Sequence, residues 1–330
     1  MSRVIFRTEA SSLIGIVHLK RCLNLARALT ELGEFCVFAV NKETITIYPE
    51  LQIEFQTEIF PSCYEEIAET REFVNNLDLI VVDSPDLGIA WEKKLTINKL
   101  IAIDDLNRAH QVDLLIDQNF RLQYDSCYPN TNARKLLGPK YGLLDSSFRI
   151  AREKSLPLLA REKKLLIAYE ETTPRDIVVS TCLSLRRPFN EAWSSELITG
   201  ASLETDALIT SLKSKVLLIT GQLPNLSNIL SESQLVLGAG AAMHWESFCL
   251  GVPCLTLTVS EAQSEINNDL ASAGYIELLG EMKSFDFYTL SIRIAELAMN
   301  DQKRLEISKK CLDLVDGLGA ERVAREISIL

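Results

Sequence analysis

Short apolar runs rich in β-branched residues alternate along the chain with longer segments whose apolar positions recur at helical spacing. This alternation predicts parallel sheets whose strands are joined by crossover helices. Five strands are expected in the first half, at residues 4–6, 35–40, 79–82, 100–103 and 114–116. Five more are expected in the second half, at residues 165–169, 197–199, 216–220, 235–237 and 254–257. The pattern therefore predicts an α/β protein.

A charged stretch at residues 149–164 separates the two halves of this pattern and contains Pro157. The chain has 330 residues, which is more than a single hydrophobic core usually accommodates. We therefore expect an N-terminal domain at residues 1–150 and a C-terminal domain at residues 151–330. Both should be Rossmann-like doubly wound domains that face a central cleft. Ligands of such sheets bind beyond the carboxyl ends of the strands, so we expect the functional residues to lie in the loops there.

The first expected strand is followed by a helical pattern at about residues 15–32, with Gly33 as the stop signal. His18 falls in the first turn of this helix. The partial positive charge of a helix N-terminus disfavours a protonated imidazole, so His18 is expected to be neutral and able to accept a proton. A general base is one interpretation. The other is a histidine that caps the turn or packs beside Lys20 and Arg21.

Residues 235–253 combine a strand, a glycine turn, a helix and a Gly/Pro stop. Gly238 and Gly240 allow backbone N–H groups to approach a diphosphate at the helix N-terminus. Glu246 lies four residues after Ala242 on the same helix, where its carboxylate could accept hydrogen bonds from ribose hydroxyls. Alternatively, the two glycines permit tight strand-to-helix packing and Glu246 is solvated, because two glycines are a weak signal alone.

Acidic residues follow two of the expected strands, namely Asp83 after residues 79–82 and the pair Asp104 and Asp105 after residues 100–103. Their position at the carboxyl ends of strands is that of functional groups in this fold class. Carboxylates in loops are nevertheless most often solvated. Solvation is therefore the commoner explanation for these three side chains, and a place in the site is the alternative.

Composition narrows the choice of function. The net charge of −11 disfavours a nucleic-acid partner, and no apolar run is long enough for membrane insertion, so a cytoplasmic protein is expected. The eight cysteines lack metal-ligand spacing, as do the three histidines, so no metal and no cofactor are expected. The motifs typical of nucleoside triphosphatases, serine hydrolases and NAD-binding enzymes are missing from the sequence.

Four segments together resemble the PseG family, the UDP-sugar hydrolases of pseudaminic (nonulosonic) acid biosynthesis. They lie at residues 15–26, 103–106, 137–141 and 238–246, and the resemblance spans nearly the whole chain. That family is similar in fold to two-domain GT-B glycosyltransferases such as MurG. The resemblance implies an inverting, metal-independent hydrolase that releases UDP from an amino-deoxy sugar nucleotide.

The resemblance also implies roles for single residues. His18 matches the histidine of the family's G-x-G-H motif and would position or activate water. The other positions that the motifs imply for substrate binding are Gly15, Arg21, Asp83, Gly238, Gly240, Ala241, Ala242, Met243, Glu246 and Gln263. Among these, Gly240 to Met243 would contact phosphate and Glu246 would contact ribose.

The sequence departs from the family's motifs at several positions on the sugar side. Val17, Pro85 and Ala262 replace the family's glycine, tyrosine and asparagine, and residues 169–174 replace its Gly-Gly loop. Two alternatives to UDP-sugar hydrolysis therefore stay open. One is a GT-B glycosyltransferase that uses a UDP-sugar donor, and the other is a homologue that binds nucleotide sugars without turnover.

Overall fold

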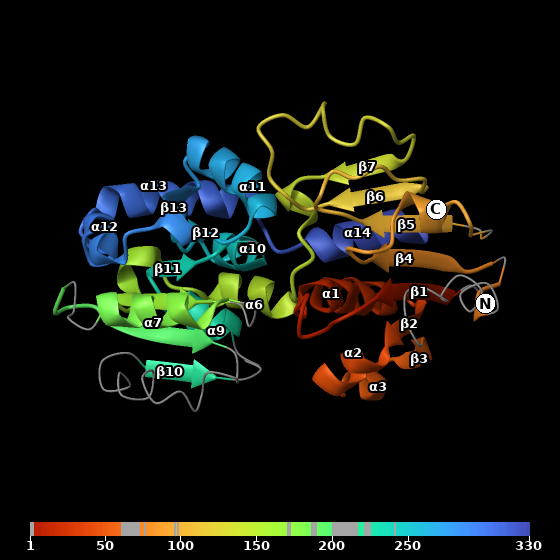
Figure 1. Cartoon of the computed structure of the whole chain (residues 1–330), viewed down its shortest axis with the longest axis horizontal. Coiled ribbons are helices and arrows are strands. Elements are labelled where there is room, and N and C mark those ends of the chain that lie inside the picture. The colour runs from red at the N-terminus through yellow and green to blue at the C-terminus, as the bar shows by residue number, and fades with distance from the viewer. Residues whose placement is uncertain are drawn as a thin grey trace. The chain divides into compact units, whose positions relative to one another are not determined.

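The chain divides into two compact units, which Figure 1 shows in a computed structural model. The structure describes residues 3–60, 73–75, 77–95, 97, 99–169, 173–185, 190–199, 217–220, 226–240 and 242–330. Unit 1 comprises Met1–Asp145 and Gly317–Leu330, and unit 2 comprises Ser146–Asp316. Each unit contains its own parallel sheet with helices, so the prediction of two doubly wound α/β domains is confirmed.

Within the described residues, unit 1 is built on a seven-stranded parallel sheet of order β3-β2-β1-β4-β5-β6-β7. Its elements are β1 (Arg3–Thr8), α1 (Val17–Glu31), β2 (Phe35–Asn41), α2 (Lys42–Ile47), α3 (Leu51–Glu54), β3 (Gln56–Phe60), β4 (Leu79–Asp83), α5 (Ile89–Glu92), β5 (Lys99–Ile103), β6 (Leu114–Asp117), β7 (Arg134–Leu137), the 3₁₀ helix η1 (Pro139–Tyr141) and α14 (Gly319–Ser328). The strand order reverses direction between β1 and β4. That pair is therefore the switch point at which ligands of doubly wound sheets bind.

The described part of unit 2 contains a six-stranded parallel sheet of order β10-β9-β8-β11-β12-β13. Its elements are α6 (Ser146–Lys154), η2 (Leu158–Ala160), β8 (Lys164–Ala168), α7 (Arg175–Ser184), β9 (Ser194–Thr199), β10 (Leu217–Thr220), α9 (Leu226–Glu232), β11 (Leu235–Gly238), α10 (Ala242–Cys249), β12 (Cys254–Thr258), α11 (Glu261–Ser272), β13 (Ile276–Glu281), η4 (Met282–Ser284), η5 (Phe287–Thr289), α12 (Leu290–Ala298) and α13 (Asp301–Leu314). Here the order reverses between β8 and β11. The glycine turn of the sequence therefore follows a switch-point strand.

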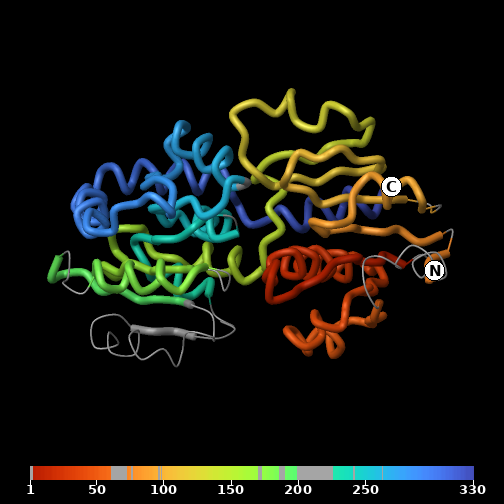
Figure 2. Tube along the Cα trace, viewed as in Figure 1, coloured from red at the N-terminus to blue at the C-terminus, as the bar shows by residue number. Residues whose placement is uncertain are grey.

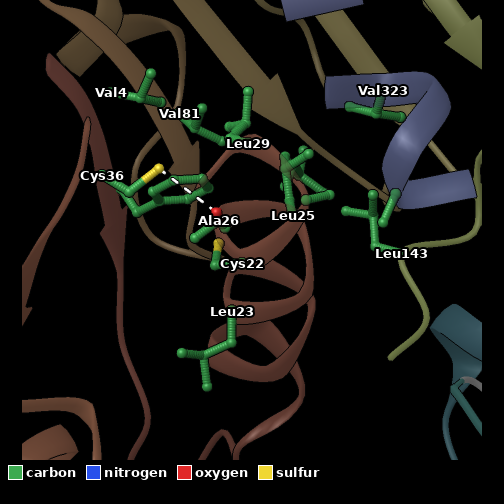
Figure 3. Packing of buried hydrophobic residues seen from close by; sticks show 14 of the residues in the cluster. Val4, Cys22, Leu23, Leu25, Ala26, Leu29, Cys36, Val81, Leu143 and Val323 are labelled. Atoms are coloured by element: carbon green, nitrogen blue, oxygen red, sulfur yellow. Dashed lines mark hydrogen bonds between the residues drawn. The ribbon is translucent and has the colours of Figure 1, made fainter. Parts of the chain in front are cut away.

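Helix α1 buries one face in the core of unit 1, as Figure 3 shows. Cys22, Leu25, Ala26 and Leu29 follow helical spacing and are all fully buried. They pack with residues of the central strands such as Val4. The helix ends as the sequence predicts, because the N–H groups after its last turn bond back to the carbonyl groups of Leu29 and Thr30.

The last helix, α14, belongs to unit 1 although it follows unit 2 in the chain. It packs on α1, and Figure 2 shows its blue trace among the elements of unit 1. Its apolar face joins the core cluster of unit 1 through Ala320, Val323, Ala324 and Ile327. The predicted C-terminal domain at residues 151–330 is therefore wrong in its last 14 residues, since burial of this face ties them to unit 1.

The change from unit 1 to unit 2 also differs from the predicted boundary between residues 150 and 151, which falls inside α6. Helix α6 packs on α9 and α10 of unit 2. Its Arg152 donates hydrogen bonds to the carbonyl oxygens of Cys249, Leu312 and Val315 at 2.8–3.0 Å. These bonds satisfy carbonyl groups at helix ends, so the whole of α6 belongs with unit 2.

A close backbone approach fixes the start of α14. A Cβ atom added at Gly319 would overlap with the carbonyl oxygen of Gly142, which is backbone and cannot rotate away. We expect Gly319→Ala to destabilise unit 1 by roughly 1–3 kcal/mol through this overlap. Chemical denaturation followed by circular dichroism measures the effect. Gly88→Ala is the matched control, since nothing lies within 4 Å of its added Cβ; equal stability of both variants would contradict the prediction.

None of the helices that the structure describes is long and apolar enough to cross a membrane.

Candidate functional site

His18, Arg21 and Asp83 form one hydrogen-bonded group at the switch point of unit 1. His18 is the second residue of α1, Arg21 follows one helical turn later, and Asp83 is the last residue of β4. The Nδ1 atom of His18 lies 2.7 Å from Oδ1 of Asp83. Arg21 donates from Nη2 to the same Oδ1 at 2.7 Å and from Nε to Oδ2. The structure thus brings Asp83 into contact with two residues of α1 that lie 65 and 62 positions before it in the sequence.

The tautomer of His18 follows from this geometry. An ionised carboxylate only accepts hydrogen bonds, so Nδ1 of His18 carries the proton and donates it to Asp83. Nδ1 also lies 3.1 Å from Nη2 of Arg21, because both nitrogens donate to the same Oδ1 atom. In the neutral ring Nε2 is then the acceptor, and among the described residues nothing hydrogen-bonds to it. The side chain is 18% exposed, so this nitrogen can meet a substrate.

Charge keeps Asp83 ionised in spite of its complete burial. Burial alone would raise the pKa of this carboxyl group, but the charge of Arg21 and the hydrogen bonds from Arg21 and His18 lower it below the usual range. Burial likewise acts to lower the pKa of Arg21, and the carboxylates of Asp83 and Asp105 outweigh it and raise it well above the usual value. Asp83 and Arg21 are therefore both charged at neutral pH.

The commoner explanation for the strand-end carboxylates, solvation, is wrong for Asp83 and Asp104, which are both fully buried. The positive charges of arginine side chains compensate the negative charges of both carboxylates. The local sequence around a carboxylate does not predict such a partner. Asp105 is about one-third exposed and accepts a hydrogen bond from Nη1 of Arg21 at 2.9 Å. Arg21, which the resemblance assigns to substrate binding, thus has its guanidinium occupied by Asp83 and Asp105 and acts in this structure as a support for His18.

The loop between β1 and α1 turns back on itself through Gly15. The N–H group of Gly15 donates to the carbonyl oxygen of Ser11 at 2.8 Å, and its φ angle is +73°. A residue with a side chain rarely adopts this angle, so Gly15 shapes the entry into α1. Val17, the replacement of the family's second glycine, is half-buried as the first residue of α1.

The sequence interpretation missed a second polar group at the same switch point. Glu9 directly follows β1, and its carboxylate accepts hydrogen bonds from Oγ of Ser84 at 3.0 Å and Nδ2 of Asn41 at 3.2 Å. The three residues stand at the carboxyl ends of β1, β4 and β2, next to one another in the sheet. The signal that points to them is the same one that singled out Asp83, namely a polar residue where a strand ends.

Asp104 is part of a separate buried network beyond β5. It accepts a hydrogen bond from Nε of Arg108 at 2.6 Å and lies 3.5 Å from Nε2 of His110. Nδ1 of His110 lies 2.6 Å from Oε1 of Glu92. Burial acts to lower the pKa of His110, but the two carboxylates outweigh it and raise the pKa to about 9. This network fixes the loop after β5 that also carries Asp105.

In unit 2 the glycine turn leads from β11 into α10. A Cβ added at Gly238 would lie 3.0 Å from the carbonyl oxygen of Ala168 on β8, so this glycine permits close packing of the two switch-point strands. Gly240 has a φ angle of +105°, which side chains rarely allow. An added Cβ there would also meet His244 and Asn267 at 3.0 Å. Packing therefore explains Gly238, whereas the turn itself requires Gly240.

Neutral polar side chains line the inner face of this turn. His244 is buried, its Nε2 lies 2.9 Å from Oγ1 of Thr256, and burial lowers its pKa to about 3. Asn267 is buried too and donates from Nδ2 to Oγ1 of Thr258 at 3.1 Å. Since His244 is uncharged, it adds no positive charge at the start of α10, and the helix N-terminus is the positive element there.

The other predicted residues of unit 2 lie near the start of α10 and α11. Ala242 and Met243 begin α10 and are half-buried, as is Glu246 in its next turn. Ala241 lies outside the described residues, as do residues 170–172 of the replaced loop. Gln263 accepts a hydrogen bond from the N–H group of Val259 at 3.3 Å, so its side chain carbonyl is used at the entry to α11.

The seven cysteines in the described part of the chain are buried free thiols. Cys63 lies outside that part. Among the described residues no group of three or more histidine, cysteine, aspartate or glutamate side chains is arranged to hold a metal ion.

Known proteins resemble this chain in sequence at a low level. The spore coat polysaccharide biosynthesis protein SpsG of Bacillus subtilis is 23% identical over 318 residues, which cover 94% of this chain and 93% of that protein. The UDP-2,4-diacetamido-2,4,6-trideoxy-beta-L-altropyranose hydrolase of Campylobacter jejuni is 28% identical over 120 residues, which cover 36% of this chain and 42% of that protein. No family model matches the sequence.

Solved structures resemble the chain in fold along its whole length. MurG of Acinetobacter baumannii has a TM-score of 0.67 at 11% identity, covering 99% of this chain and 100% of that one. UGT89C1 of Arabidopsis thaliana complexed with UDP-L-rhamnose has a TM-score of 0.67 at 13% identity, covering 98% of each chain. The chain therefore has the two-domain α/β fold of GT-B glycosyltransferases.

Proposed function

We propose that this protein is a UDP-sugar hydrolase that attacks the anomeric carbon with water and releases UDP. The observation that carries the proposal is His18, whose Nδ1 is held by Asp83 while Nε2 is left as an acceptor. A histidine in this state is suited to act as a general base. The sequence similarity to a UDP-sugar hydrolase over part of the chain supports the same reaction class.

In the proposed reaction Nε2 of His18 accepts a proton from water as the water oxygen forms a bond to the anomeric carbon. The bond between that carbon and the diphosphate oxygen breaks, and its electron pair leaves with UDP. Asp83 stabilises the imidazolium that forms, and Arg21 with Asp105 holds Asp83 in place. Water attacks from the face opposite to the diphosphate, so the sugar is released with inverted configuration.

The leaving diphosphate is assigned to the glycine turn before α10. A helix N-terminus carries free N–H groups and a partial positive charge, which together stabilise an anion as it departs. Gly240 allows the backbone to turn at this point, and Ala242 and Met243 supply N–H groups of the first turn of α10. Glu246, one turn further on, is assigned to the ribose hydroxyls.

Sugar transfer is the second candidate function, favoured by the glycosyltransferases among the similar structures. His18 would then take its proton from an acceptor hydroxyl group. UDP release from UDP-sugars, followed with and without candidate acceptors, separates the two reactions. Release that requires an acceptor would contradict hydrolysis, and UDP binding without release under either condition would identify a binding protein.

Glu246→Gln tests the nucleotide assignment. We expect UDP affinity to fall by roughly 1–3 kcal/mol, because an amide is a poorer acceptor for ribose hydroxyls than a carboxylate. Isothermal titration calorimetry with UDP measures the loss. Glu261→Gln, an exposed carboxylate in the first turn of α11, is the matched control and should leave affinity unchanged. An unaltered dissociation constant for Glu246→Gln would place this residue outside the nucleotide site.

A further inference from the structure

We propose that Glu9 is a specificity-determining residue that accepts hydrogen bonds from two adjacent hydroxyl groups of the sugar. This inference rests on the proposed function, since it assigns a sugar class to the same site. Glu9 is not among the residues to which the resemblance to the PseG family assigns a role, nor among the candidates that the sequence pattern indicates.

Glu9 directly follows β1, the strand next to β4, and so lies at the same carboxyl end of the sheet as the group that holds His18. Thr8, its predecessor, is the register partner of Asp83 in the pairing of β1 with β4. Ser84 follows Asp83 and donates its hydroxyl to Oε1 of Glu9. Glu9 therefore stands one residue beyond the register position of Asp83, at the carboxyl ends of the strands, where ligands of this fold bind.

The carboxylate has acceptor capacity that the protein leaves unused. Oε1 accepts from Ser84 and Oε2 accepts from Asn41, and no other hydrogen bond from the described residues reaches either oxygen. An ionised carboxylate offers about four acceptor positions, so one position on each oxygen remains open. The side chain is 11% exposed, so a ligand can reach it. A burial of this degree is costly for a carboxylate that has no further donors.

Charge and geometry decide which donors fit. The buried guanidinium of Arg7 has its Nη2 atom 3.9 Å from Oε2 of Glu9, so the negative charge already has a compensating cation. A neutral donor pair is therefore favoured over an ammonium group. Adjacent hydroxyls supply two donors at neighbouring positions, one for each oxygen. An acetamido group supplies a single N–H donor, and its carbonyl oxygen would face a carboxylate that cannot donate.

The test compares sugar preference in His18→Ala and in the double variant that adds Glu9→Gln, because loss of the base should prevent turnover during titration. The ligands are UDP, UDP-glucose, which has adjacent free hydroxyls, and UDP-2,4-diacetamido-2,4,6-trideoxy-beta-L-altropyranose, which has none. We expect His18→Ala to bind UDP-glucose at least about tenfold more tightly than the diacetamido sugar. Glu9→Gln should reduce that ratio to about threefold or less while UDP affinity stays the same.

Two controls keep the outcome clear. Glu50→Gln replaces an exposed glutamate whose side chain makes no capping bond, and it should leave every affinity unchanged. Glu9→Asp keeps the charge but shortens the side chain, so it should lower the ratio even if Glu9→Gln fails to fold. A ratio that neither variant alters, or a preference for the diacetamido sugar, would overturn the role of Glu9 alone. No affinity for UDP in any variant would overturn the proposed function and this inference with it.

Discussion

Replacing His18 by alanine should lower turnover of the UDP-sugar by about 10²–10⁴ while leaving UDP affinity close to that of the native protein. The size of the effect follows from the loss of the proposed proton acceptor, whose Nε2 has no other partner among the described residues. The variant loses the group that accepts the proton from water. It keeps the residues of unit 2 that are proposed to bind UDP, so UDP affinity should not change. Steady-state kinetics of UDP release and calorimetry with UDP measure the two quantities.

Lys20→Ala is the matched control for His18→Ala. Lys20 is exposed on the same helix, two residues further on, and its replacement should leave turnover within about twofold. Turnover by His18→Ala at the rate of the native protein would remove His18 from the mechanism, and loss of both turnover and UDP binding would indicate a change of fold instead.

Asp83→Asn should destabilise unit 1 by about 3–5 kcal/mol. The carboxylate accepts hydrogen bonds from three nitrogens, two on Arg21 and one on His18. An asparagine amide in its place turns an NH₂ group toward one of these donors and leaves the buried guanidinium with Asp105 as its charged partner. Hydrogen exchange of peptides from β1 and β4 measures the stability of this unit separately from unit 2.

Asp86→Asn provides the comparison for Asp83→Asn, since Asp86 is exposed three residues further along the same loop. Its replacement should change stability by less than about 0.5 kcal/mol. The proposed charge-stabilised group at His18 would be contradicted if Asp83→Asn altered protection as little as this control.

The central strands of both sheets could be predicted because they are buried on both faces and appear as continuous apolar runs. Strands β3, β7 and β13 were not predicted from the sequence, and all three stand at sheet edges. Polar residues interrupt them, as in Gln56–Phe60 and Arg134–Leu137, because an edge strand has one side open to solvent. These three edge strands therefore lack the signal on which strand prediction depends, whereas β10, which also stands at an edge of the described sheet, has an apolar run and was predicted.

The site was predictable residue by residue but not as a group. His18 and Asp83 could each be singled out by position, since one opens a helix and the other ends a strand. Their contact depends on the pairing of β1 with β4, and the burial of Asp83 depends on its hydrogen bonds with Arg21. Neither interaction can be predicted from the local sequence pattern. Glu9 also follows a strand, but its partners Ser84 and Asn41 belong to the ends of two other strands, so the group exists only once the sheet has formed.

The placement of α14 has a consequence for biosynthesis. Ribosomes make a chain from its N-terminus, and domains usually fold as their residues emerge. Unit 2 is contiguous and can close its core once residue 316 has left the ribosome. Unit 1 begins first, but the part of α1 that contacts α14 stays uncovered until Val323 and its neighbours arrive, so the nascent first half is the part of this protein for which we expect chaperones to be needed.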